Sequence, residues 1–303
     1  MTSTSTISLL NTIEWSKRFN FRRPIALGGY LEPAISNANI ILQTIVGPPF
    51  SWRWNRLVTG FITTPGQQDY FVFNWQANFI LPLGAVTVDS SGNCQSVTVA
   101  GTTGSTIPTW NSVGNITNDG SVTWTNLGSI NTPVSTNYSF NWIEISSVQD
   151  TINNTPKWFE MESKICSGLD STSSRPKFIS AQGDDGLGNI TIRLMPVPDQ
   201  AYPVAITMQQ KPPLFIKLSQ TWAPIPDEYS RLYQWGFLSL AWLFADDPRF
   251  GLANQKFVSQ LLSVSEGLSE TEKNIFLGNW QMITGQPVQS ANRLQQGDQM
   301  RGL

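Results

Sequence analysis

The chain contains no histidine among its 303 residues, and it has only two cysteines, Cys94 and Cys166. Histidine is the most common general base and zinc ligand in proteins. Its absence therefore excludes Ser–His and Cys–His catalytic pairs and histidine-based zinc sites. Two cysteines in a chain of this length do not form a disulfide framework, so we expect two reduced, half-buried thiols.

Charged residues are also scarce, at 13% of the sequence with a net charge of -2. This fraction is about half the usual level. Nothing in the charge balance attracts the whole chain to nucleic acid or to an anionic membrane. A weakly charged surface rich in Ser, Thr, Asn and Gln favours a protein that hides surface against neighbouring subunits. A neutral, β-rich protein is the alternative interpretation.

Long hydrophobic runs are missing as well. The densest run, Trp235–Ala245, is shorter than the roughly 20 residues needed to span a bilayer, and it indicates a buried helix instead. The N-terminus lacks the positive and apolar regions of a signal peptide. We expect neither secretion nor membrane insertion.

No catalytic or metal-binding motif is present, whether G-x-S-x-G, P-loop or H-E-x-x-H. Glu160 and Glu162 would share one face of a strand, where solvated carboxylates are more common than an acid–base pair. Asp184 and Asp185 lack the ligand spacing of a calcium loop and predict a hairpin turn. We therefore expect no enzymatic activity, no catalytic residue, no metal site and no cofactor.

The N-terminal segment is typical of helices. Ser5 or Ser8 is a candidate cap for a helix that runs to about Arg18. A second helix opens near Pro33, and apolar residues return in it at helical spacing. Gly47–Pro49 ends this helix, because proline lacks the backbone N–H and clashes with the preceding turn.

From Phe50 to about Pro213 the pattern changes to short segments rich in β-branched and aromatic residues, separated by turn residues. In Asn189–Pro196, apolar residues alternate with others as on a half-buried strand. This middle part therefore predicts an all-β domain.

Helices return after Pro213. Asp227 is a candidate cap for a helix to about Ala245, which is apolar nearly all round and is expected to be buried. Gly236 within it would allow close helix packing, at a propensity cost of roughly 1 kcal/mol.

Two further helical patterns follow. Asp247 and Pro248 are the expected cap and first residue of a new helix. Ser269 and Glu272 have the spacing of a capping box, which would open a third helix. Alternatively, one long helix continues through Gly267.

The order of helices, strands and helices predicts an α+β fold, because neither helical part could bury its apolar face alone. We expect a discontinuous helical bundle with an inserted antiparallel β-sandwich or barrel domain. The expected parts are helical residues 1–50, a β-domain at 51–213 with a small β-module at about 98–130, helical residues 214–285, and an extended tail at 286–303.

Two aromatic stretches leave alternatives open. In Pro48–Arg56, aromatic and basic residues interleave, which suits either stacking of nucleic-acid bases or a buried strand or interface. Its candidate residues for an interface or a DNA channel are Trp52, Arg53, Trp54 and Arg56. In Gly101–Gly128, Trp110 and Trp124 stand among small polar residues, and they form either a sugar-binding face or the core of a small module.

Three blocks of the sequence resemble phage head-to-tail adaptor (connector) proteins. The blocks are Gly28–Arg56, Asn189–Phe215 and Ala223–Phe250, and their order matches as well. In tail tubular protein A and similar adaptors, a strand ends in P-x-P, a turn with Ala and Tyr follows, and a second strand ends on Pro-Pro. The matching residues here are Pro196, Pro198, Ala201, Tyr202, Pro212 and Pro213.

The resemblance implies a virion protein at the head–tail junction, made in the host cytoplasm. It implies a closed ring of about twelve copies that joins the portal protein to a downstream tail or nozzle protein. Genomic DNA would pass through the ring with only non-specific contacts. The tail would contact the portal, with candidate residues Gln286, Arg293, Gln299, Met300, Arg301 and Leu303.

The Gly101–Gly128 stretch resembles a small β-module that recurs in phage tail and other virion proteins. It departs from the usual adaptor plan and is expected to be an insertion in the β-domain. Its outer face would contact a capsid or fibre protein, or a sugar. The alternative function is therefore a carbohydrate-binding or tail-accessory virion protein that uses this module.

Overall fold

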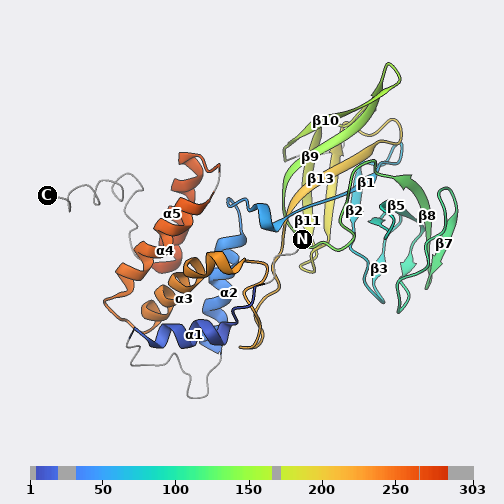
Figure 1. Cartoon of the computed structure of the whole chain (residues 1–303). Helices are drawn as coiled ribbons and strands as arrows, with labels where there is room; N and C mark the ends of the chain where they lie inside the picture. The colour runs from blue at the N-terminus through green and yellow to red at the C-terminus, as the bar shows by residue number, and fades with distance from the viewer. Residues whose placement is uncertain (1–4, 20–31, 166–171, 266, 286–303) are drawn as a thin grey trace. The chain divides into compact units, whose positions relative to one another are not determined.

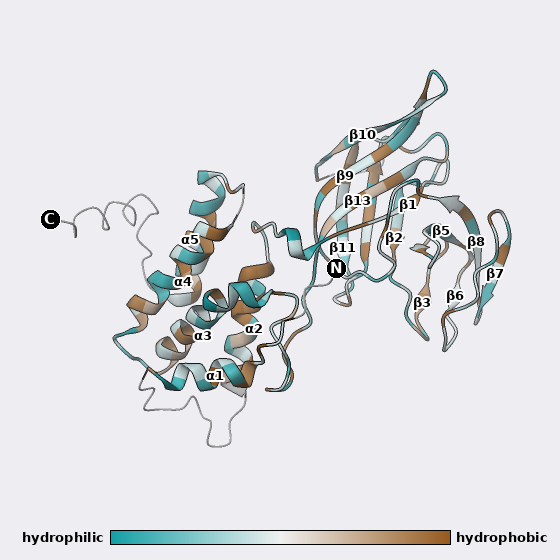
Figure 2. Cartoon of the chain, in the orientation of Figure 1, coloured by the Kyte–Doolittle hydropathy of each residue, from teal (hydrophilic) through white to brown (hydrophobic). Residues whose placement is uncertain are grey.

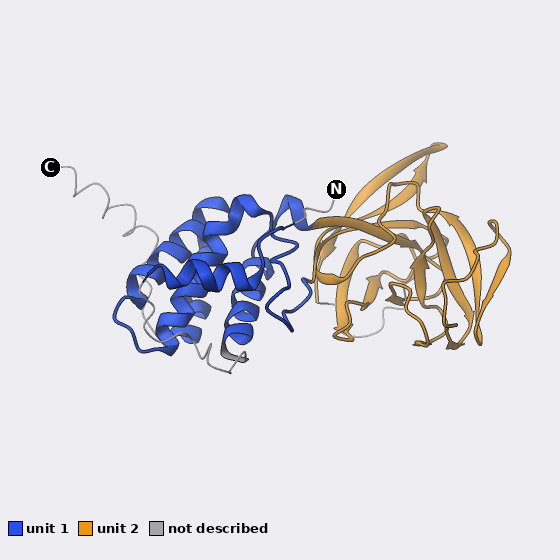
Figure 3. Cartoon of the chain, turned by 60° about the horizontal axis from the view of Figure 1, so that its bottom comes forward, with its two compact units in different colours: residues 1–55, 212–303 blue, residues 56–211 orange. Residues whose placement is uncertain are grey.

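The computed structural model describes residues 5–19, 32–165, 172–265 and 267–285 (Figure 1). The chain forms two compact units, which Figure 3 distinguishes by colour. Residues 1–55 and 212–303 make up the helical unit, and residues 56–211 make up the β unit. The fold is α+β, with helices at both ends of the chain and a β-rich part inserted between them, as predicted.

The helical unit draws its helices from both ends of the chain. The bounds are α1 Leu9–Lys17, α2 Glu32–Val46, α3 Ser230–Phe244, α4 Phe250–Val264 and α5 Glu270–Thr284, with short 3-10 helices η1 Arg53–Asn55 and η2 Asp227–Tyr229. Hydrophobic and hydrophilic residues lie side by side around these helices (Figure 2). One core joins all five helices, including Leu9, Ile41, Phe237, Phe257 and Trp280.

Two helix starts and one helix end confirm the sequence prediction. The Ser8 side chain caps α1, and Ser269 and Glu272 form the expected capping box at the start of α5. Helix α4 ends where Ser265 becomes extended, and Gly267 has a φ of +73°. The alternative of one long helix through Gly267 is therefore wrong.

Two other predicted caps are wrong. Helix α3 begins after the 3-10 turn η2, and the Asp227 carboxylate accepts hydrogen bonds from Ser5, Thr6 and Ile7 of the N-terminal segment instead. Helix α4 begins at Phe250, after a turn at Pro248 and Arg249, so Asp247 lies outside the helix although its carboxylate accepts the backbone N–H and the guanidinium of Arg249. At Asp227, donors from a segment distant in the sequence take the acceptor that a cap would need.

The β unit contains one large sheet and one two-stranded sheet. The strands are β1 Arg56–Ile62, β2 Asp69–Val72, β3 Ile80–Leu81, β4 Val86–Val88, β5 Asn93–Val99, β6 Gly101–Thr102, β7 Ile116–Asp119, β8 Val122–Ser129, β9 Phe140–Ile152, β10 Thr155–Ser163, β11 Phe178–Asp184, β12 Ile190–Met195 and β13 Pro203–Gln210. The order in the large sheet is β1-β13-β9-β10-β11-β12-β2-β4-β5-β8-β7. Its pairs are antiparallel except β10 with β11 and β2 with β4.

Much of the large sheet curls around one apolar core, which includes Phe61, Tyr70 and Ile192. Phe61 of β1 packs against Tyr70 of β2 with ring centroids 4.7 Å apart, although these strands are far apart in the sheet order. The Ile62 backbone N–H donates to the Cys94 sulfur at 3.2 Å. Cys94 is fully buried rather than half-buried, and burial raises the pKa of its thiol to about 12. Cys166 lies outside the described residues.

Candidate assembly surfaces

Helix α5 carries apolar side chains on more than one face. Phe276, Leu277 and Trp280 are buried in the core of the helical unit. Ile275 and Met282 lie seven residues apart, so they share one face of the helix, and their side chains are 57% and 78% exposed. Ile283 beside them is 51% exposed. This outer stripe is apolar surface beyond what the core of the unit needs.

A groove lies between this stripe and the end of α2. Its volume is about 390 Å³, and Pro48, Pro49, Ile275 and Ile283 are among its lining residues. Gly47 follows the last residue of α2 and its N–H still donates to Gln43, so the two prolines emerge directly from the helix end. The groove can therefore accept an apolar side chain from another molecule.

Further exposed apolar residues of the helical unit lie near the junction of α3 and α4. Phe244, the last residue of α3, is 66% exposed, and Leu252 in the first turn of α4 is 55% exposed. Between them, Arg249 pairs with Asp247 and its guanidinium lies 4.8 Å from the Trp242 ring. The side-chain hydrogen bond from Arg249 holds the pKa of Asp247 below its usual value.

The aromatic and basic residues of Pro48–Arg56 fall into structurally different places. Trp52 is buried, donates its indole N–H to the Ile45 carbonyl at 2.6 Å, and stacks on Trp54 with centroids 5.3 Å apart. Trp54 packs partly buried against the same core. Both tryptophans therefore pack on the core of the helical unit, Trp52 just before the 3-10 helix η1 and Trp54 within it.

The two arginines of this stretch also differ. Arg53 is exposed in the 3-10 helix η1. Arg56, the first residue of β1, donates to both carboxylate oxygens of Glu144, at 2.6 and 2.7 Å. The structure therefore places the two rings against the core of the helical unit and both arginines at exposed positions.

The two tryptophans of Gly101–Gly128 do not form a coplanar platform. Trp124 on β8 is fully buried, whereas Trp110 is only partly buried. Their rings are 5.6 Å apart and nearly perpendicular, at 83°. Strands β7 and β8 extend the large sheet beyond β5, around a separate apolar cluster that includes Phe73, Val97 and Trp124.

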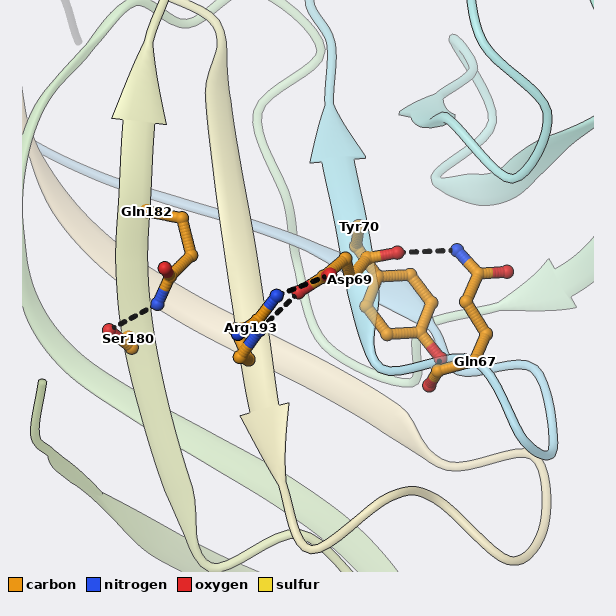
Figure 4. A network of polar contacts seen from close by, with 6 residues as sticks. All are labelled: Gln67, Asp69, Tyr70, Ser180, Gln182 and Arg193. Atoms are coloured by element: carbon orange, nitrogen blue, oxygen red, sulfur yellow. Dashed lines mark hydrogen bonds and ion pairs between the residues drawn. The ribbon is translucent and has the colours of Figure 1, made fainter. Parts of the chain in front are cut away.

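A polar network joins β2 and β12 in the β unit, and on the neighbouring β11 Gln182 donates to Ser180 at 2.8 Å (Figure 4). The Arg193 guanidinium donates to both oxygens of Asp69, at 2.7 and 2.8 Å, directly across the β2–β12 pair. Gln67 donates to the Asp69 carbonyl at 2.8 Å, and the Tyr70 hydroxyl donates to the Gln67 carbonyl at 2.9 Å. Burial raises the pKa of the Tyr70 phenol. These bonds are satisfied within the sheet, so the network supports the register of its strands.

The remaining acidic candidates show no arrangement for chemistry. Glu160 and Glu162 are exposed on β10, and Asp184 and Asp185 shape the β11–β12 turn by accepting backbone N–H groups. Among the described residues, no group of acidic or cysteine side chains could hold a metal ion.

Within the same residues, no helix is long and apolar enough to cross a membrane. The candidate portal contacts at 286–303 lie outside the described residues.

Sequence reasoning did not single out the stripe and groove of α5. Ile275 was expected on a helix, but its helical spacing does not show which apolar positions a neighbouring helix covers. The number of apolar residues in this helix could have indicated the stripe. Helix α5 has Ile275, Met282 and Ile283 in addition to the apolar residues that one packed face can bury.

Comparison with known proteins gives one clear result. The family model described as SU10 adaptor protein matches residues 92–274, which is more than half of the chain. The match includes the Gly101–Gly128 stretch and runs through α3 and α4 into the first turn of α5. No curated protein matches the chain at a significant level. The chain therefore belongs to the SU10 adaptor protein family, and it is an adaptor-type structural protein of a phage virion.

Proposed function

We propose that this protein is the subunit of a head-to-tail adaptor ring of the tail tubular protein A type. The ring docks beneath the portal, joins it to the next tail or nozzle protein, and surrounds part of the DNA path. Membership of an adaptor family supports the general role. The exposed apolar stripe of α5 is the observation that supports assembly through the helical unit.

A closed ring needs two different faces on each subunit, because every copy meets one neighbour on each side. The α2–α5 groove, with Ile275 and Ile283 at its wall, is a suitable receiving face. Phe244 and Leu252 are the apolar residues that suit the opposing face. Burial of one such side chain stabilises a contact by about 1.5–3 kcal/mol.

The portal contact is assigned to residues 286–303, which follow α5 directly. The candidates there include two arginines, Arg293 and Arg301, which suit an acidic or polar partner surface. In the Pro48–Arg56 stretch, the exposed Arg53 is the residue suited to a neighbouring subunit or to DNA. Contact with DNA would be non-specific and strongly weakened by salt, because it rests on phosphate charge alone.

The test compares three purified proteins with and without portal rings, by mass measurement and electron microscopy. The proteins are the full chain, a truncation that ends at Gly285, and the variant Ile275→Glu/Met282→Glu. The full chain is expected to form a ring on the portal. The truncation should keep its fold but fail to dock, and the double variant should stay monomeric because two carboxylates are placed in the contact.

The matched control is Leu187→Glu, an equally exposed apolar position in the β11–β12 turn, at 62% exposure. It should assemble as the unmodified protein does. Normal docking by the truncated protein would overturn the assignment of the arm. Normal rings from the double variant would overturn the α5 interface, and no ring from any of the proteins would overturn the proposed function.

A further inference from the structure

The β unit also contains a hollow. Its volume is about 620 Å³, within the range of roughly 300–1,000 Å³ that small-molecule sites occupy. Its walls come from the segment after β2, the end of β4 with the turn that follows, the loop before β7 and the segment before β9. Trp75 and Trp110 are the two aromatic residues in these walls.

The rest of the lining is uncharged and mostly polar, with Val88, Ile107 and Pro108 as its apolar residues. All of the described lining residues are neutral, and they include Asn74 and Asn137 as amides and Ser90, Ser91 and Thr109 as hydroxyls. Amides and hydroxyls both donate and accept hydrogen bonds. A ligand that suits this lining carries many hydroxyl groups and no charge. The lack of a lysine or arginine in the wall disfavours a phosphate or a nucleic-acid backbone.

Trp75 is held in place by a buried carboxylate. Its indole N–H donates to Asp119 at 2.8 Å, and Asp119 is only 3% exposed. The same oxygen accepts from the indole of Trp124 at 3.2 Å, and the other oxygen accepts from the Gly104 backbone at 2.7 Å. One carboxylate thus fixes the indole of Trp75 and the start of the loop that carries Trp110.

Trp110 is also held in place, by the ring of Trp124 and by hydrogen bonds of the next residue. Its ring meets the fully buried Trp124 edge to face, with centroids 5.6 Å apart. The next residue, Asn111, receives a hydrogen bond from Asn126 at 2.8 Å and donates its N–H to Thr117 at 3.0 Å. The aromatic walls therefore exist before a ligand arrives, so little ordering entropy is lost on binding.

We propose that this pocket, lined by Trp75 and Trp110, binds an uncharged glycan. A sugar ring presents one face of C–H groups, which packs on an aromatic ring, and a rim of hydroxyls, which the amides and hydroxyls of the wall bind. Trp124 takes no direct part, because it is fully buried and serves as the support for Trp110. The site is contained in the β unit and does not depend on ring assembly.

The test screens the full-length protein on immobilised neutral hexasaccharides of glucose, mannose, galactose and N-acetylglucosamine, and then titrates the best binder by calorimetry. Trp110→Ala is expected to weaken binding at least about tenfold, which corresponds to about 1.4 kcal/mol. Asn137→Ala should also weaken binding while leaving the core intact, because this residue is exposed and its side chain accepts a hydrogen bond from Asn74 at 3.4 Å. Thermal unfolding of both variants checks that they are folded.

The matched control is Trp158→Ala, a tryptophan of β10 that is 38% exposed and does not line the pocket. It should bind as tightly as the unmodified protein. If none of the hexasaccharides binds at about 1 mM, the proposal is overturned. A loop of another protein would then be the alternative occupant of the pocket. Unchanged affinity in both pocket variants would also overturn it. Loss of glycan binding with normal portal docking separates this site from the assembly function.

Discussion

At the scale of single residues, Asp227 shows how one carboxylate ties the two ends of the chain together. It accepts hydrogen bonds from the Ser5 hydroxyl at 2.9 Å and from the Thr6 backbone at 3.1 Å. The hydrogen bond from the Thr6 hydroxyl is the largest cause that lowers the pKa of Asp227 below its usual value. The N-terminal segment before α1 is thereby fastened to the 3-10 turn before α3.

A pH dependence follows from this lowered pKa. The unfolded chain binds the proton more tightly than the folded one, so the stabilisation is fully present above the usual pKa of about 3.9. It is lost as pH falls through the lower pKa of the folded state. Asp227→Ala should therefore lower the free energy of unfolding by about 1 kcal/mol at neutral pH, since the site is partly exposed. Urea unfolding across the acid range measures the difference.

The neighbouring Glu228 provides the control for this prediction. Glu228→Ala removes the same charge from an exposed position and should leave the free energy of unfolding nearly unchanged. The gap between the two variants should close in acid, where Asp227 is protonated in both states. A gap that persists unchanged at low pH would show that the carboxylate charge is not what holds the N-terminal segment.

At the scale of elements, two helical glycines should respond in opposite directions to alanine. A Cβ at Gly236 of α3 would lie 2.9 Å from Ile41 of α2 and 2.9 Å from the Phe257 ring of α4. A Cβ at Gly278 of α5 meets nothing within 4 Å. Gly236→Ala should destabilise the helical unit by roughly 1–2 kcal/mol, because the clash outweighs the gain in helix propensity.

Gly278→Ala serves as the counterpart of this variant. It should raise the free energy of unfolding by up to about 1 kcal/mol, because only the helix propensity changes. Chemical unfolding monitored by far-UV circular dichroism measures both effects. Equal effects of the two substitutions would contradict the close approach of α2, α3 and α4 at Gly236.

The elements also show what the sequence could and could not predict. Local signals were sufficient for the strand alternation of Ile190–Met195 and for the capping box at Ser269, because the residues that decide these features are neighbours in the chain. Asp227 was misjudged because its donors in the N-terminal segment become its neighbours only through folding. The start of α4 was misplaced for a local reason, because Pro248 and Arg249 form a turn before the first helical residue. The sequence also did not predict the pocket at Trp75. Asp119 and Trp110 are distant from Trp75 in the chain and lie near it only in the folded β unit.

At the scale of the whole molecule, the two units have separate cores. The core of the helical unit includes Phe237 and Trp280, whereas the core of the β unit includes Phe61 and Tyr70. The family match covers parts of both units, so the sequence pattern of the family extends over both. The chain enters the β unit at Arg56, which pairs across the β1–β13 ladder with Gln209 near the point where the chain leaves.

This pairing predicts that either unit can be produced without the other. Paired residues of antiparallel strands have Cα atoms about 5 Å apart, so a short glycine linker can join Asn55 to Pro212 when residues 56–211 are removed. The excised helical unit should give a helical circular dichroism spectrum and unfold cooperatively. The fragment 56–211 should give a β spectrum with its own transition, because its core contains no residue from outside the fragment. If either piece lacks a cooperative transition, its core depends on the other unit, and the insertion is not an independent domain.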